Sequence, residues 1–294
     1  MYLIEICVII ANEIQRKVVT IMKLSNNLNL QQLLESDWAD QFNRAQLSEI
    51  RTGLNRNVDV YYADPSITSD KMKVLRHASE HGVNLLEYAK DFTTHQLEAL
   101  LEGAKHNINY QIYANRKYNY TQMLTIAQGL LLNLDVTYYL DHRFDTNQMK
   151  VILKGLVHDV DVSIFAKLKY SDTQMHIICE ELIRGNDVSR ITNHNYSAAM
   201  MRTLNEILIY KGFDLFQYAD AGYTLSQIEQ IEHGLQIKAP IELYKSKDFD
   251  HLQMNQIIRG YANGIDVTQY ASPDVPWIEM KRIREKLRKE GKKK

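Results

Sequence analysis

Cysteine and proline are scarce in this chain, and each scarcity excludes a class of structure. The 294 residues include two cysteines, Cys7 and Cys179, too few for a disulfide framework, and we expect both thiols to be reduced in a cytoplasmic protein. There are four prolines and no sustained alternation of polar and apolar residues, so a mostly helical chain is predicted. The apolar N-terminal run is interrupted by Glu5 and is too short to span a bilayer, so we expect no membrane association.

The sequence also lacks the signature motifs of common enzymes and metal sites. It contains no G-x-x-x-x-G-K-[ST], G-x-G-x-x-G, G-x-S-x-G or C-x-x-C. His77 and His81 have i, i+4 spacing on one predicted helix face, but no third ligand follows at a fixed offset, so we expect solvated surface histidines. We therefore predict no enzymatic activity, no cofactor and no metal.

What the chain does contain is a unit that recurs every 25 to 27 residues. Its anchor is an apolar residue that follows a polar one, and it occurs ten times, at Leu47, Met72, Leu97, Met123, Met149, Met175, Met201, Ile228, Met254 and Met280. Apolar residues continue at three and commonly seven positions after the anchor, the stripe of an amphipathic helix. A fixed period of this length indicates a solenoid of stacked repeats.

Each copy carries the signals of a helix start. Four residues before the anchor stands a small residue that can accept from free backbone N–H groups, namely Asn43, Thr68, Thr93, Asn119, Asp145, Ser171, Ser197, Thr224 or Asp250, with Pro276 in the tenth copy. In seven copies a glutamine follows three residues later, completing a capping box, and Glu279 holds that position in the last copy. An apolar residue just before the cap is placed as a hydrophobic staple.

Glycine and asparagine mark two later positions of the unit. Six residues after the anchor, glycine recurs inside the helix, where it costs roughly 1 kcal/mol relative to alanine, at Gly53, Gly103, Gly129, Gly155, Gly234 and Gly260. We interpret this as the close approach of a neighbouring backbone. Four positions further on, residues that tolerate the left-handed conformation are predicted to end the helix, at Asn57, Gly82, Asn107, Asn133, Gly185 and Gly264.

A second, shorter element follows that stop. It begins with an Asp or Asn that can cap a helix of one to two turns, and seven copies place a tyrosine in it: Tyr62, Tyr88, Tyr113, Tyr139, Tyr218, Tyr244 and Tyr270. The predicted fold is therefore all-α, an α-solenoid of about ten two-helix repeats. We divide the chain into an N-terminal extension and capping unit (residues 1–41), the repeat array (42–280) and a basic C-terminal tail (281–294).

Some residues depart from the repeat or are not explained by it. The stretch from Cys179 to Tyr218 drifts, with one residue inserted near Gly212, which can mark a bend, a partner site or relaxed selection. Among the remaining tyrosines, Tyr61 and Tyr138 are predicted on the outward face of the short helix, and Tyr120 on the first turn of a long one. Exposed tyrosines can anchor a partner protein, although scattered surface aromatics are also ordinary.

Charge is distributed unevenly along the chain. Residues 281–294 carry nine Lys and Arg against two Glu, a net +7, so the other 280 residues carry −8 of the total −1. The tail is predicted to fray from its helix and could neutralise phosphates of a nucleic acid, whereas the acidic body would repel a long duplex. Its candidate nucleic-acid contacts are Lys281, Arg282, Arg284, Arg288 and Lys289.

The unit, written [S/T/D/N]-x-x-Q-M-x-x-I-x-x-G-L followed by D-V-x-x-Y-A, resembles a helical tandem repeat of about 26 residues in uncharacterised proteins of Gram-positive bacteria, their phages and mobile elements. The resemblance covers residues 42 to 280 and is weakest in the copies centred on Met175 and Met201. It implies a helical array and no catalytic residue. It also implies an accessory protein that binds a host protein, such as a defence nuclease.

Two functions remain open from the sequence. The first is a non-enzymatic scaffold for protein–protein interaction, inhibiting a host defence protein in the manner of an anti-CRISPR protein. The second is a nucleic-acid-associated protein that uses the basic tail. The extended surface of a helical array favours the first.

Overall fold

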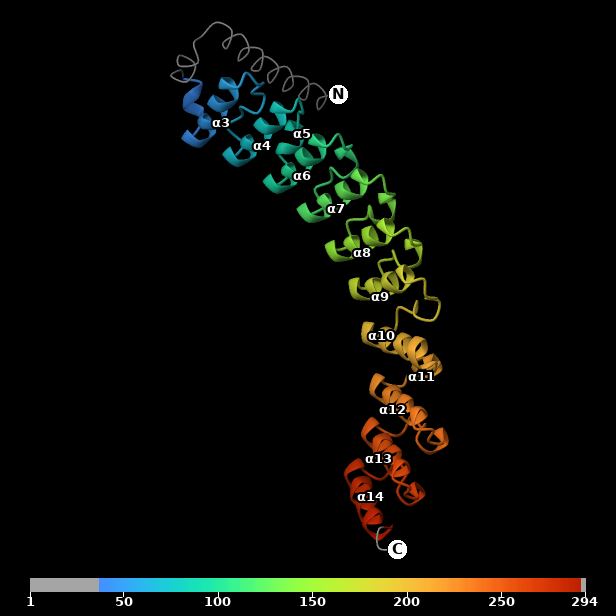
Figure 1. The fold of residues 1–294 in the computed structure, drawn as a ribbon. Helices are drawn as coiled ribbons and strands as arrows, with labels where there is room; N and C mark the ends of the chain where they lie inside the picture. The colour runs from blue at the N-terminus through green and yellow to red at the C-terminus, as the bar shows by residue number, and fades with distance from the viewer. Residues whose placement is uncertain (1–36, 292–294) are drawn as a thin grey trace, which may run out of the picture. The chain divides into compact units, whose positions relative to one another are not determined.

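The computed structural model describes residues 37–291 (Figure 1), so most of the predicted N-terminal unit and residues 292–294 of the tail lie outside the described residues. Residues 37–291 form twelve α-helices and no strand, which confirms the all-α prediction. The α-helices are α3 (Arg44–Asn55), α4 (Ser69–Glu80), α5 (Leu86–Ala89), α6 (Thr94–Lys105), α7 (Tyr120–Leu131), α8 (Thr146–Val157), α9 (Asp172–Ile183), α10 (Ala198–Glu206), α11 (Phe216–Asp220), α12 (Leu225–Gln236), α13 (His251–Ala262) and α14 (Trp277–Gly291).

Shorter turns connect the long helices. The 3₁₀ turns are η1 (Ala39–Gln41), η2 (Tyr110–Ile112), η3 (Val136–Tyr139), η4 (Val162–Ile164), η6 (Ile241–Leu243) and η7 (Val267–Gln269). One π-helix, η5 (Ile207–Lys211), continues directly from α10. The predicted short helix is therefore a single 3₁₀ turn in most copies, and an α-helix of four or five residues in α5 and α11.

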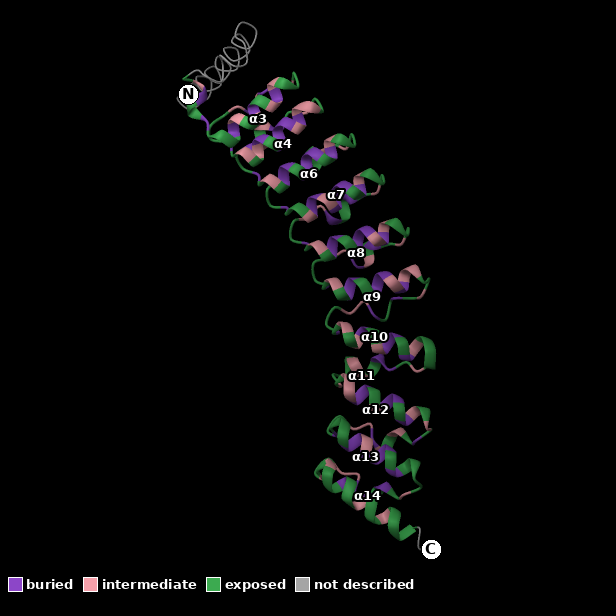
Figure 2. Cartoon of the chain, turned by 60° about the vertical axis from the view of Figure 1, so that its left-hand side comes forward, coloured by how far each residue is buried: buried purple, intermediate pink, exposed green. Residues whose placement is uncertain are grey.

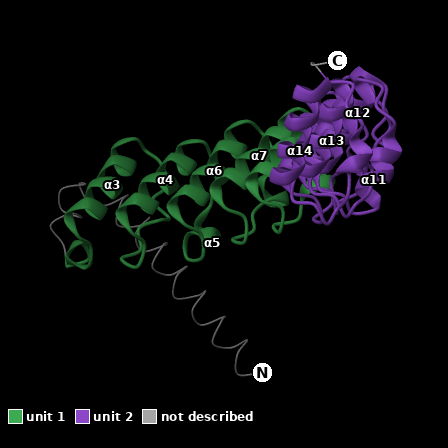
Figure 3. Cartoon of the chain, turned by 90° about the horizontal axis from the view of Figure 1, so that it is seen from below, with its two compact units in different colours: residues 1–153 green, residues 154–294 purple. Residues whose placement is uncertain are grey.

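The chain divides into two compact units at Leu153 and Lys154, inside α8 (Figure 3). In the first unit α3 packs on α4, α4 on α6 and α6 on α7. In the second α9 packs on α10, α12 on α13 and α13 on α14. Figure 2 shows buried and exposed residues interleaved along each long helix, as expected for amphipathic helices. Nine of the ten anchors have no exposed surface, Leu47 being the partly exposed one.

Most helix ends form as the sequence predicts. Complete capping boxes begin α3, α6, α7, α9, α12 and α13. All six predicted stop residues have positive φ, from 54° at Asn57 to 77° at Gly185. Thr68 is an exception because its side chain makes no cap hydrogen bond. Ser197 caps α10 alone, since the glutamine position is Met200.

The capping-box glutamine also has a second function that the sequence did not reveal. While Gln122 Oε1 accepts from the Asn119 N–H at 2.7 Å, its Nε2 donates to the carbonyls of Phe144 at 2.6 Å and His142 at 3.3 Å. The same pair of bonds reaches 19 to 22 residues downstream from Gln46, Gln96, Gln174, Gln227 and Gln253. The glutamine thus ties its own helix start to the segment that enters the next copy.

The glycine inside the long helix accommodates a side chain, so the prediction of a close backbone was wrong. A Cβ on Gly103 would lie 1.9 Å from the Tyr113 hydroxyl, which donates to the Ala99 carbonyl one turn earlier at 3.2 Å. Tyr62, Tyr139, Tyr244 and Tyr270 approach their own glycines in the same way, and Phe165 approaches Gly155. The missing side chain therefore creates room for an aromatic ring of the following short element.

Candidate functional site

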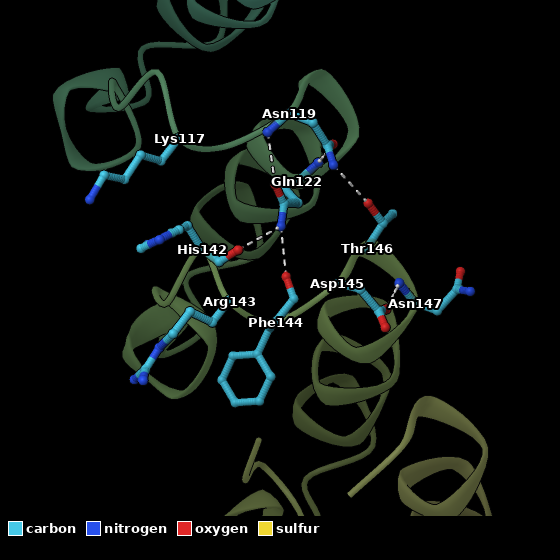
Figure 4. A pocket seen from close by; sticks show the side chains of 9 residues that line it. All are labelled: Lys117, Asn119, Gln122, His142, Arg143, Phe144, Asp145, Thr146 and Asn147. Atoms are coloured by element: carbon cyan, nitrogen blue, oxygen red, sulfur yellow. Dashed lines mark hydrogen bonds between the residues drawn. The ribbon is translucent and has the colours of Figure 1, made fainter. Parts of the chain in front are cut away.

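An open pocket of about 520 Å³ lies in the first unit beside the first turns of α7 and α8 (Figure 4). It is lined by Lys117, Asn119, Gln122, His142, Arg143, Phe144, Asp145, Thr146 and Asn147. Most of its polar groups already have structural partners. Asp145 Oδ1 accepts from the Asn147 N–H at 2.7 Å, and Asn119 Nδ2 donates to Thr146 Oγ1 at 3.4 Å.

The charges around this pocket nearly cancel. Arg143 Nε lies 3.0 Å from both carboxylate oxygens of Asp141, and this hydrogen bonding lowers the pKa of Asp141 to about 2. The two cations Lys117 and Arg143 are balanced by the carboxylates of Asp141 and Asp145. The Lys, Arg and Asp side chains around the pocket therefore give it no excess charge of one sign for binding an ion.

The structure places the three candidate tyrosines differently. Tyr120 and Tyr138 are exposed, at 41% and 39%, as predicted. Tyr61 is only partly exposed, and its hydroxyl donates to the carbonyls of Leu75 at 3.2 Å and Val83 at 3.0 Å. Burial raises the pKa of Tyr61 to about 12. Tyr61 therefore attaches the short element to α4 and its following turn, and its predicted outward orientation was wrong.

The basic C-terminal segment is helical rather than frayed, because α14 continues to Gly291. Lys281, Arg282, Arg288 and Lys289 are exposed on this helix. Arg284 differs from them since it is buried, and its Nε donates to Gln256 Oε1 on α13 at 3.2 Å. Arg284 thus belongs to the packing between α13 and α14 and does not face an external ligand.

A further candidate site is the π-helix η5, which lies in the drifting stretch from Cys179 to Tyr218 that the sequence left open as a bend, a partner site or relaxed selection. The spacing from Met201 to Ile228 is 27 residues instead of 26, and η5 takes up the extra residue before Gly212 ends the helix at φ 73°. Within η5, Ile209 is 39% exposed and Tyr210 is 76% exposed. Lys211 pairs with the largely buried Glu232 of α12 at 2.9 Å, which fixes the end of the turn. The sequence signal was the inserted residue, whose structural effect could not be read from the pattern.

Among the large hydrophobic side chains of residues 37–291, Tyr210 is the most exposed. A π-turn is rarer and less favourable than an α-turn and often occurs at functional sites. The inserted residue therefore replaces a regular helix end with a disfavoured turn that places an aromatic ring in solvent. Such a ring has the properties of an anchor for a partner protein.

Other reactive groups within residues 37–291 have structural surroundings. No group of three or more His, Cys, Asp and Glu could hold a metal ion in this part of the chain. His77, expected to be solvated, is partly buried beside Arg76. Its burial, and after that the positive charge of the Arg76 guanidinium, lowers the pKa of the His77 imidazole. Burial raises the pKa of the Cys179 thiol to about 11, which disfavours the reactive thiolate. None of the described helices is long and apolar enough to cross a membrane.

Comparisons with known proteins add no family to these observations. No family model matches the chain, and no curated protein and no solved structure matches it.

Proposed function

We propose that this protein is a non-enzymatic scaffold for protein–protein interaction, built as an α-solenoid of about ten two-helix repeats. Three contacts recur from copy to copy: the capping box, the hydrogen bonds from its glutamine to the next copy, and the packing of an aromatic ring on the helix glycine. Their recurrence supports the same packing of successive copies. Stacked repeats of this kind offer an extended surface for binding. Side chains that differ from the repeated pattern can then provide specific contacts to a partner.

The observation that carries the proposal is the exposure of Tyr210 on η5. Rigid aromatic side chains supply much contact area for little conformational entropy, and they dominate the energetics of many interfaces. The resemblance of the repeat to proteins of phages and mobile elements makes a host defence protein the first partner to test. In this function the protein acts by binding its partner and blocking the partner's activity, and no residue is catalytic.

Replacing Tyr210 by Ala is expected to abolish partner capture while leaving the fold intact. Because the ring is 76% exposed, we expect the free energy of unfolding to change by about 0.5 kcal/mol or less. The measurement is an affinity capture from nuclease-treated host lysate, with quantitative mass spectrometry of the proteins retained. Tyr261→Ala is the matched control, since Tyr261 is also exposed but lies on the regular helix α13.

A second variant separates the turn from the ring. Deleting Ile209 restores the 26-residue spacing and should convert η5 to a regular α-helical end that retains the tyrosine. We expect this deletion also to lose the captured protein. If the parent, Tyr210→Ala and the deletion variant all retain the same proteins, η5 is not the binding site.

Nucleic-acid association remains a second candidate because Lys281, Arg282, Arg288 and Lys289 are exposed on α14. Changing these four residues to Gln is expected to remove any affinity for a fluorescent duplex and to flatten its dependence on salt concentration. Arg284→Gln should act instead through stability, because Arg284 is buried against α13. Duplex binding that persists in the fourfold variant would exclude α14 as the contact.

A further inference from the structure

The stretch of chain that contains η5 is strongly acidic. Residues 172–232, which run from α9 to α12 and include η5, contain nine Asp and Glu against four Lys and Arg, a net charge of −5. The remaining residues from 1 to 280 therefore carry −3, so this stretch holds most of the negative charge of the body. An acidic segment attracts cationic partners and raises their association rate.

Ion pairing does not remove this imbalance, although Lys154 from outside the stretch pairs with Glu180. Three of the four cations are already paired: Arg184 with Glu181, Arg190 with Asp214 at 3.0 Å, and Lys211 with Glu232 at 2.9 Å. In contrast, Asp187, Glu206 and Glu229 are exposed and take part in no ion pair within residues 37–291. The uncompensated charge of this stretch is therefore carried by accessible carboxylates.

Glu206 lies close to the exposed ring along the chain. It is the last residue of α10, four positions before Tyr210, and the helix continues through η5 without a break. An accessible carboxylate and an accessible aromatic face thus lie about one turn apart. A Lys or Arg side chain of a partner can pair with the carboxylate while it stacks on the ring.

We infer that η5 binds a Lys- and Arg-rich amphipathic segment of a partner protein, whose apolar face receives Tyr210 and Ile209 and whose cations meet Glu206 and its acidic neighbours. This inference rests on the proposed function and adds the chemistry of the partner. Nucleic acids are disfavoured at this surface, since their phosphates would face several accessible carboxylates and, within residues 172–232, Arg202 as the one exposed cation outside the ion pairs.

The test uses the full chain and two synthetic peptides of about 18 residues, roughly five helical turns. Both peptides share one leucine face, and their polar faces carry lysine in one and glutamate in the other. Fluorescence anisotropy is expected to show the lysine peptide binding at least roughly tenfold more tightly, with affinity falling as salt is raised. Tyr210→Ala should weaken this binding roughly tenfold, and Glu206→Gln roughly threefold. Tyr261→Ala should leave it unchanged.

Two outcomes would overturn the inference. Binding of the lysine peptide that Tyr210→Ala leaves unchanged would mean that diffuse charge alone attracts the peptide. Equal or tighter binding of the glutamate peptide, or Tyr210-dependent binding of a fluorescent duplex, would show that the partner chemistry is wrong. In either case, if capture of a protein from lysate still depends on Tyr210, the proposed function stands although the inferred partner chemistry fails. The two failures can therefore be distinguished.

Discussion

Gly103→Ala is expected to destabilise the protein by about 2 kcal/mol, although alanine is the better helix former. The new Cβ would lie 1.9 Å from the Tyr113 hydroxyl, closer than atoms can pack, and 3.1 Å from its Cζ, a tight contact. Tyr113 is completely buried, so its ring cannot turn away without opening a cavity. Overpacking costs typically about 1–3 kcal/mol or somewhat more in a rigid core, and the gain in helix propensity offsets about 1 kcal/mol.

A double-mutant cycle tests the cause of that loss. Tyr113→Phe alone should cost about 1 kcal/mol, the hydrogen bond to the Ala99 carbonyl. Combined with Gly103→Ala, the same change should leave a total loss of about 1–2 kcal/mol instead of the additive value of about 3 kcal/mol, because it removes the atom that clashes with the new methyl group. Urea unfolding measures all four free energies, and a coupling of about 1–2 kcal/mol between the two sites is expected. Additive losses would contradict the glycine–hydroxyl contact.

The glycine–aromatic contact also explains an irregularity among the repeats. Tyr88 and Tyr218 are only half-buried, and both occur in copies that lack the glycine, where Ala78 and Ile207 stand instead. In these copies a leucine, Leu85 or Leu215, is buried at the start of the short element. The recurrence of glycine was visible in the sequence. Its partner was not identified because the two are ten residues apart on different elements, and only their co-occurrence across copies could have linked them.

The helix starts were predictable because capping is local. A cap and its glutamine are three residues apart, so their spacing alone fixes the geometry. The second pair of bonds made by Gln122 reaches Phe144, 22 residues away, and a local pattern contains no information about that distance. In helix α14 the cap position is Pro276 and the glutamine position is Glu279, whose side-chain carboxylate has no N–H to donate to a downstream carbonyl.

The candidate site was less predictable than the fold for a related reason. Tyr61 and Tyr138 were assigned to the same outward face, yet Tyr61 bonds to carbonyls of the following copy and Tyr138 is exposed. Arg284 was counted with its exposed neighbours, although it is buried against α13. Such differences arise from packing between copies. The insertion before Gly212 was recognised, but whether it forms a loop, a kink or a π-turn depends on tertiary contacts such as that between Lys211 and Glu232.

Gln122→Glu is expected to destabilise the protein by about 3 kcal/mol at pH 7, even though Glu is a standard capping-box residue. The carboxylate can still accept from the Asn119 N–H, so the local cap is preserved. Both donated bonds are lost, and a negative oxygen is brought against the carbonyls of Phe144 and His142. Leaving a buried acceptor unsatisfied costs about 1–3 kcal/mol, and desolvation of the charge adds to that.

The dependence of this loss on pH distinguishes its cause. Burial and the facing carbonyls should raise the pKa of the new carboxyl in the folded state above its unfolded value of about 4.3. A raised folded pKa gives stability that is fully present below the unfolded pKa and is lost as pH rises through the folded one. The variant should therefore approach the parent in stability below about pH 4 and fall away from it toward pH 7.

Two control variants accompany this prediction. Gln122→Met should lose the same stability at pH 4 and at pH 7. Glu279→Gln, at the equivalent exposed position of α14, should change the stability little. A pH-independent loss in Gln122→Glu would mean that the segment entering α8 moves away from the substituted side chain, so that the two bonds do not hold successive copies together.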